Sequence, residues 1–132
     1  MSMRSRHLSV VIAAPPDVVY RYAANPGNLP HWAAGLAAGV RKEGDLLIID
    51  SPMGEVTVRF EPPNRHGILD HDVTLPDGTV VNNPLRVLTH PEGAEVVFTV
   101  RQRDLTDKQF DDDCAAVQRD LESLRNAVTG RS

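Results

Sequence analysis

The segment from Thr106 to Gly130 carries the clearest hydrophobic pattern of the chain. Its apolar residues recur at alternating spacings of four and three, which places them on one stripe of an α-helix. The stripe consists of Phe110, Cys114, Val117, Leu121, Leu124 and Val128. Thr106 and Gln109 have the spacing of a capping box, and Gly130 is positioned to end the helix. The pattern predicts one long C-terminal helix that needs an extensive apolar partner.

The N-terminal part of the chain predicts one strand followed by two short helices. Residues 7–13 alternate between apolar and polar, as in a half-buried β-strand. Pro15-Pro16 ends this strand and suits the first turn of a helix over residues 18–23. That helix stops at residues 25–27, because a residue before proline avoids the helical region. Asn28 can then cap a second short helix.

Between Val40 and Arg103 the sequence alternates between short apolar stretches and turns. The predicted strands are residues 46–50, 55–61, 68–75, 79–89 and 95–101. Pro84 interrupts the fourth of these, which indicates a bulge or an edge. Short turns such as Pro76-Asp77-Gly78 favour an antiparallel meander over a parallel sheet. We therefore expect a curved antiparallel sheet of six to seven strands whose concave face receives the long helix.

Composition describes one ordinary globular domain. The chain has 132 residues, of which 41% are hydrophobic and 24% charged, so we expect a single domain over residues 1–132. The net charge of −4 and the absence of a cationic run disfavour nucleic acid as a partner. The apolar run near the N-terminus is too short for a signal peptide or a membrane span, which makes the cytoplasm the expected location. The single cysteine, Cys114, is predicted to be a buried, inert thiol.

The layout resembles the helix-grip fold of the START/Bet v 1-like (SRPBCC) superfamily, which includes proteins labelled polyketide cyclase/dehydrase. Residues 10–20, VVIAAPPDVVY, resemble the family's first strand and helix start, and residues 25–32, NPGNLPHW, resemble its second-helix signature. The resemblance implies an α+β fold and an apolar cavity between sheet and long helix. It also implies a ligand such as a lipid, sterol or polyketide. Some members are cyclases or dehydratases and others carriers, so the fold alone does not select an activity.

The segment RHGILDHDVTL, residues 65–75, holds the most unusual polar cluster. Alternation places His71 on its more apolar face, toward the cavity, and Asp70 and Asp72 on the outer surface. No metal site is predicted, because His66, Asp70 and Asp72 would diverge along one strand. Inside the cavity, His71 could act as a general acid or base. Alternatively, it is a core histidine satisfied by one hydrogen bond.

Asn83 is the second candidate for a polar group in the cavity. Facing inward, its amide could hold a ligand carbonyl or hydroxyl. Alternatively, Asn82 and Asn83 satisfy backbone groups freed by Pro84. By the family resemblance, Trp32 lies near the cavity entrance as a core or lid anchor. The predicted ligand-binding residues are Trp32, Phe60, His71, Asn83, Phe98, Phe110, Cys114 and Val117.

Three functions follow from this pattern. The leading hypothesis is binding of a hydrophobic or amphipathic small molecule, of lipid, polyketide or aromatic type, without a cofactor. The second is a cyclase or dehydratase in which His71 is the general base and Asn83 orients a carbonyl. The third is a protein-interaction module or homodimer that uses the sheet edge or outer face.

Overall fold

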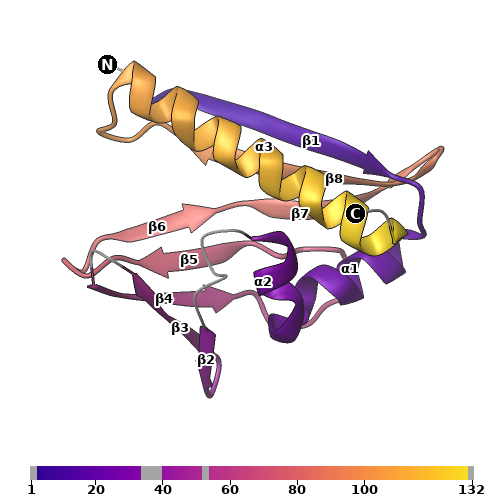
Figure 1. Cartoon of the computed structure of the whole chain (residues 1–132), viewed down its shortest axis with the longest axis horizontal. Helices are drawn as coiled ribbons and strands as arrows, with labels where there is room; N and C mark the ends of the chain where they lie inside the picture. Colours follow the sequence, from indigo (N-terminus) through magenta and orange to yellow (C-terminus); the bar gives the residue numbers. More distant parts are fainter. Residues whose placement is uncertain (1–2, 34–39, 52–53, 131–132) are drawn as a thin grey trace.

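The computed structural model describes residues 3–33, 40–51 and 54–130 of the chain. Its elements are β1 (Ser5–Ile12), α1 (Pro16–Ala24), the 3₁₀ turn η1 (Pro26–Asn28), α2 (Leu29–Trp32), β2 (Val40–Glu43), β3 (Leu46–Ser51), β4 (Gly54–Phe60), β5 (His71–Thr74), β6 (Val80–Asn83), β7 (Leu85–His90), β8 (Gly93–Arg101) and α3 (Asp107–Thr129). The fold is α+β, with two short helices after the first strand and one long helix lying across antiparallel strands (Figure 1). This is the predicted arrangement.

The strands of the described residues form two antiparallel sheets. One has the order β1-β8-β7 and the other β2-β3-β4-β5-β6. The predicted strand over residues 79–89 is in fact two strands, because Pro84 has no N–H to donate and the ladder breaks there. The strand β2 was not predicted, so the described residues form eight strands and not the expected six to seven.

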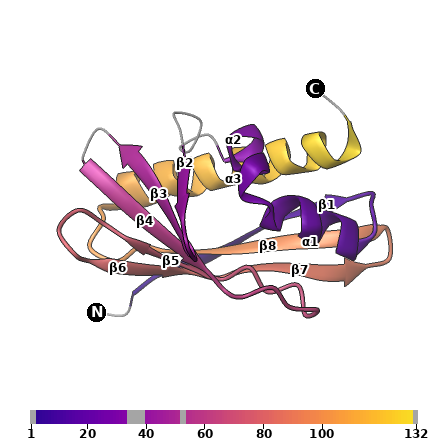
Figure 2. The same ribbon diagram turned by 90° about the horizontal axis from the view of Figure 1, so that it is seen from below.

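Backbone hydrogen bonds across the break keep the two sheets together. Leu69 N–H donates to the Leu85 carbonyl at 2.8 Å, and Val87 N–H donates to the Gly67 carbonyl at 2.8 Å. The segment before β5 therefore pairs with β7. Figure 2 shows β2, β3 and β4 leaning toward the side on which α3 lies, while β7 and β8 run below the helix. The strands thus curl around α3.

The long helix α3 carries both predicted end signals. The Thr106 hydroxyl accepts from Gln109 N–H, and the Gln109 side chain accepts from Thr106 N–H, so the capping box is complete. Gly130 ends the helix with a φ of 75°, a left-handed conformation that favours glycine. The predicted stripe faces the sheets, and Leu121 and Leu124 are completely buried. Within the described residues, no helix has the length and apolar character needed to cross a membrane.

The short helices close one end of the fold against α3 (Figure 1). The prediction that the Asn28 side chain caps α2 is wrong, because Asn28 already has helical backbone angles. Its amide instead donates to the Tyr22 carbonyl at 3.2 Å. The side chain that caps in this region belongs to Asn25, which accepts from Gly27 N–H at 2.9 Å. These contacts fix the position of Trp32 at the end of α2.

Candidate ligand-binding site

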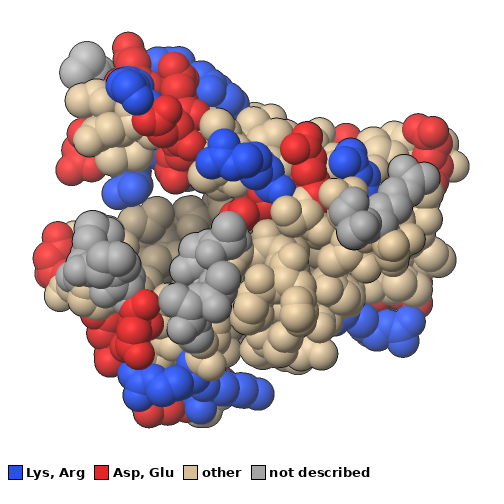
Figure 3. Space-filling model, in the orientation of Figure 1, with Lys and Arg blue, Asp and Glu red and all other residues tan. Residues whose placement is uncertain are grey.

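A cavity of about 290 Å³ lies between the curled strands and α3. Figure 3 shows the molecule hollowed between α3 and the strands opposite it. The walls come from α2, β3, β4, β5, β8 and α3, so both sheets and the helix contribute. The lining residues are Leu29, Trp32, Ala33, Ile49, Val56, Val58, Phe60, His71, Val73, Phe98, Val117, Asp120 and Leu121. Almost all of these are apolar, as in sites for small hydrophobic ligands.

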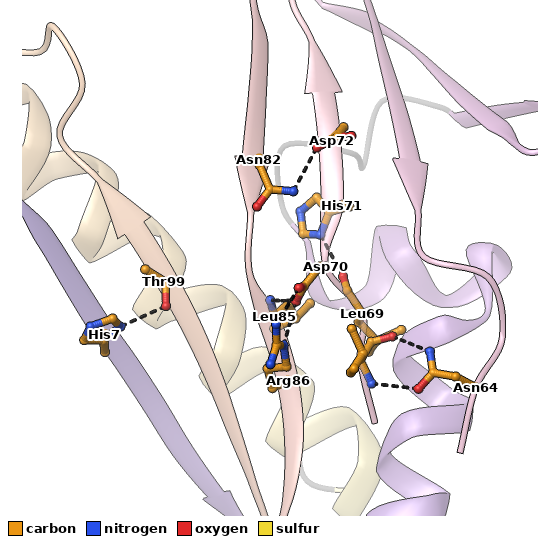
Figure 4. Close-up of polar contacts among 11 residues, drawn as sticks. His7, Asn64, Leu69, Asp70, His71, Asp72, Asn82, Leu85, Arg86 and Thr99 are labelled. Carbon is orange, nitrogen blue, oxygen red and sulfur yellow. Dashed lines mark hydrogen bonds and ion pairs between the residues drawn. The ribbon is translucent and has the colours of Figure 1, made fainter. Parts of the chain in front are cut away.

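His71 lies on the inner face of β5, with its ring between two phenylalanines. The centroid of its ring is 4.7 Å from that of Phe60 and 5.9 Å from that of Phe98. Its Nδ1 lies 3.0 Å from the Leu69 carbonyl oxygen (Figure 4). Because a carbonyl can only accept, Nδ1 must carry the proton in this hydrogen bond. In the neutral ring, Nε2 is then an acceptor with a free lone pair.

Burial keeps the His71 imidazole neutral. Desolvation lowers its pKa below the ordinary value of 6.5 and outweighs the hydrogen bond to Leu69 and the nearby charges of Asp70 and Asp72, which act in the opposite direction. Nε2 makes no hydrogen bond within the part of the chain that the structure describes. His71 therefore offers the cavity a hydrogen-bond acceptor and a potential base at neutral pH.

Trp32 carries a second unusual polar group. Its side chain lines the cavity and is only 6% exposed. Its indole N–H is the single buried side-chain nitrogen or oxygen without a hydrogen-bond partner among the described residues. A buried donor left unpaired costs about 1–3 kcal/mol, so such groups are rare in native proteins. Trp32 therefore carries a buried donor that no group in the described part of the chain satisfies.

Asp70 and Asp72 are not among the residues that line the cavity, and their hydrogen-bond partners differ (Figure 4). Asp70 is only 16% exposed, and its carboxylate accepts from Leu85 N–H and from both Nε and Nη2 of Arg86, at 2.7–2.9 Å. The Arg86 hydrogen bond holds the pKa of Asp70 below its usual 3.8. Asp72 is exposed and accepts from the Asn82 amide at 2.8 Å. Asp70 thus ties β7 to the segment before β5.

His66, Asp70 and Asp72, the residues considered for a metal site, do not form a ligand group. His66 is exposed and lies in the loop before β5, and the partners of Asp70 are Leu85 and Arg86. In the described ranges, no three His, Cys, Asp or Glu side chains gather in a group that could hold a metal ion. At the break beside Pro84, Asp70 satisfies the Leu85 N–H, a role that one of the two interpretations of Asn82 and Asn83 gave to the asparagine amides.

No protein-family model matches the chain, and no curated protein matches its sequence. Solved structures match its backbone over nearly its full length. The Bet v 1 allergen Ara h 8.0201 is 10% identical with a TM-score of 0.66, over 98% of this chain and 100% of that one. Protein CV1439 from Chromobacterium violaceum is 15% identical with a TM-score of 0.68, over 94% and 96%. DynU16, from the dynemicin biosynthetic locus, is 14% identical with a TM-score of 0.73, over 96% of this chain and 48% of that one.

This chain has the Bet v 1-like helix-grip fold. The resemblance that residues 10–20 and 25–32 suggest is therefore correct for the fold. These segments form the end of β1 with α1, and the turn η1 with α2, which are parts of the scaffold. At 10–15% identity the shared helix-grip fold does not identify a ligand or a reaction.

Five of the eight predicted ligand-binding residues line the helix-grip cavity: Trp32, Phe60, His71, Phe98 and Val117. Strand alternation was enough to place the three aromatic side chains of β4, β5 and β8 inward.

The other three predicted residues lie outside this lining. Asn83 stands opposite His71 in the β5–β6 register, but it lines a smaller depression of about 170 Å³ beside Arg101 and Arg103. Phe110 and Cys114 pack in a separate apolar cluster with Val100, near the start of α3. The guanidinium of Arg6 covers the Phe110 ring at 4.9 Å. The first turns of α3 therefore fasten the helix and do not line the cavity.

Several lining residues were not predicted. Val56 and Val58 share the alternation of Phe60, so the same signal could have found them. Asp120 had no such signal, because an acidic residue beside Leu121 is normally assigned to the solvent side of a helix.

Proposed function

We propose that this protein binds a small hydrophobic or amphipathic molecule in the cavity between the strands and α3. The observation that carries the proposal is the cavity itself, about 290 Å³ with a predominantly apolar wall. An apolar cavity of about 150 Å³ holds a benzene molecule. The space here therefore suits a bicyclic compound or a chain of similar bulk.

The likeness to Ara h 8.0201 and DynU16 supports a cavity-based role without naming the ligand. In the proposal the protein works in the cytoplasm and needs no cofactor. Native mass spectrometry of the freshly purified protein would show a co-purified ligand, and its subunit count would test the alternative of a homodimer.

Trp32 makes a direct binding test possible, because it is the single tryptophan of the chain and lines the cavity. Titration with naphthalene, indole and 2-naphthol should change its fluorescence with saturation. Val117→Phe places a ring in the cavity and should abolish binding. Ala115→Phe, on the exposed face of the same helix, should bind like the wild type. If none of the compounds binds, or if both variants bind equally, the proposal is wrong.

A second candidate function is acid–base catalysis on a carbonyl compound in the same cavity. The specific observation in its favour is the neutral His71 ring, whose Nδ1 is occupied by Leu69 and whose Nε2 is free within the described residues. Such a nitrogen can remove a proton next to a carbonyl. A bicyclic ketone, 2-tetralone, would exchange its α protons with D₂O faster in the presence of the enzyme. Equal exchange with wild type and His71→Gln would exclude this function for that ketone.

A further inference from the structure

The apolar cavity adjoins the smaller depression of about 170 Å³ beside the N-terminal half of α3. Val73 lines both spaces, so they meet at this side chain. On the helix, Asp113 of the depression lies about one turn before Val117 of the cavity. On the strands, Asn83 of the depression stands opposite His71 of the cavity. Figure 3 shows basic side-chain atoms at the edge of the hollow under this part of α3.

The depression adds positive charge at the border of the apolar cavity. Arg101 and Arg103 line it, and Asp113 is the single acidic residue among its described lining residues, which leaves an excess of one positive charge. The described lining of the cavity itself contains neither Lys nor Arg. An apolar space that leads to a basic one matches a molecule with an apolar body and an anionic group at one end.

Arg103 is the basic residue with donors available for a ligand. A guanidinium group has five N–H donors, yet the charged partner of Arg103 within the described residues is Asp104 at 4.0 Å, which is too long for a hydrogen bond. The Arg103 side chain is only 31% exposed, although arginine is mostly exposed in proteins. Arg101, in contrast, already donates to the Ser5 hydroxyl at 3.0 Å.

The backbone of Arg103 is a second, independent sign of a functional position. Its φ is 54°, and no other non-glycine residue of the described ranges has a positive φ. A side chain disfavours this left-handed conformation, and residues held in it cluster at binding and active sites. Leu105 N–H donates to the Gln102 carbonyl at 3.0 Å, and the Gln102 amide donates back to the Leu105 carbonyl at 3.0 Å. These bonds close the turn, so Arg103 is positioned before a ligand arrives.

We propose that the ligand is an amphipathic monocarboxylate, with its apolar part in the cavity and its carboxylate bound by Arg103 at the depression. This inference rests on the proposed ligand-binding function and adds the charge and the position of the polar group. A guanidinium can donate two parallel hydrogen bonds to one carboxylate, and the Asn83 amide in the same lining offers a further donor. From Asp113 to Leu121 the two linings cover about 12 Å of α3, which is comparable to the length of extended decanoate.

The test is isothermal titration calorimetry at pH 7 with decanoate, 1-decanol and decylamine, each below its micelle-forming concentration. The three compounds share a chain and differ in the charge of one end. Because charge-assisted hydrogen bonds are about twice as strong as neutral ones, decanoate should bind about tenfold more tightly than 1-decanol. Decylamine should bind most weakly, since its ammonium group would face an excess of positive charge. High salt should reduce the preference for decanoate.

Variants of Arg103 assign the preference to this side chain. Arg103→Gly should fold like the wild type, because glycine readily adopts a positive φ. It should lower the affinity for decanoate about tenfold and change the affinity for 1-decanol by less than about twofold. Arg119→Gln is the matched control, since it removes one positive charge from an exposed position of α3 outside both linings. It should leave both affinities unchanged.

Wild-type results alone can refute the inference. If 1-decanol or decylamine binds as tightly as decanoate, the carboxylate assignment is wrong while the proposed binding function stands. If Arg103→Gly keeps the full preference for decanoate, the assignment to Arg103 is wrong. If no compound of this series binds while naphthalene or 2-naphthol does, the inference alone fails. If none of these compounds binds, the proposed function fails with it.

Discussion

Replacing Asp70 should destabilise the protein more than a change at a strand end usually does. Its carboxylate links the segment before β5 to β7 through one backbone N–H and two donors of Arg86. The contact lies where Pro84 breaks the strand, so few other hydrogen bonds hold the two sheets together there. Asp70 is 16% exposed, whereas the Arg86 side chain is 49% exposed.

Asp70→Asn and Asp70→Ala separate the stability contributed by the ion pair with Arg86 from that contributed by the hydrogen bond with Leu85 N–H. The half-exposed pair with Arg86 is screened by solvent, so it contributes about 0.2–1 kcal/mol. A buried hydrogen bond from a backbone N–H to a carboxylate contributes about 1.5–3 kcal/mol. Asp70→Asn retains an acceptor for Leu85 N–H and should cost about 1 kcal/mol, while Asp70→Ala loses both contributions and should cost about 2–3 kcal/mol.

Urea denaturation at pH 7 with a constant m-value would measure these differences. Asp72→Asn and Asp72→Ala are the matched controls, since Asp72 is exposed two residues away and should change stability by less than about 0.5 kcal/mol. Because the pKa of Asp70 is lowered in the folded state, its contribution is present above pH 3.8 and is lost as the pH falls below that value. If Asp70→Ala is no less stable than Asp72→Ala, the proposed role of Asp70 at the junction is wrong.

Three further outcomes are expected. The folded protein keeps His71 neutral, whereas His71 in the unfolded chain binds a proton below pH 6.5. The wild type should therefore lose more stability than His71→Phe when the pH falls from 6.5 to 5. Equal losses in urea titrations would contradict this. Cys114 is only 3% exposed, and burial raises the pKa of its thiol. A thiol reagent should therefore label Cys114 only at the rate of unfolding. Rapid labelling of the native protein would contradict this prediction. Gly93→Ala should destabilise the protein by about 2 kcal/mol or more, because Gly93 has a φ of 137° and a Cβ there would lie 2.5 Å from the Ile12 carbonyl oxygen. Gly78→Ala is the control, because a Cβ at Gly78 would meet open space, and it should destabilise the protein less in the same thermal melts.

Local patterns predicted the elements whose structure is determined locally. The helix expected from Thr106 to Gly130 spans Asp107–Thr129, because capping and periodicity are contained within a few turns. Alternation in β4 and β8 likewise placed Phe60 and Phe98 inward, since a strand has only two faces.

Contacts between residues that are far apart in the chain could not be predicted from the sequence. The partner of Asp70 is Arg86, and nothing in the pattern around residue 70 indicates that pairing. The sequence interpretation placed Asn83 in the cavity, whereas Asn83, although paired with His71 in the register, lines the smaller depression. The unpaired Trp32 N–H is likewise visible only when every surrounding acceptor has a position.

The pairing of β1 with β8 also constrains how the protein is made. Ser5 pairs with Arg101 at one end of this ladder, and ribosomes add about 5–20 residues per second. The apolar face of β1 is therefore synthesised about 5–20 s before its partner strand β8, and still longer before α3. During that interval the nascent chain carries an unpaired, aggregation-prone edge. The cavity, whose last wall is α3, can form only after this helix has left the ribosome.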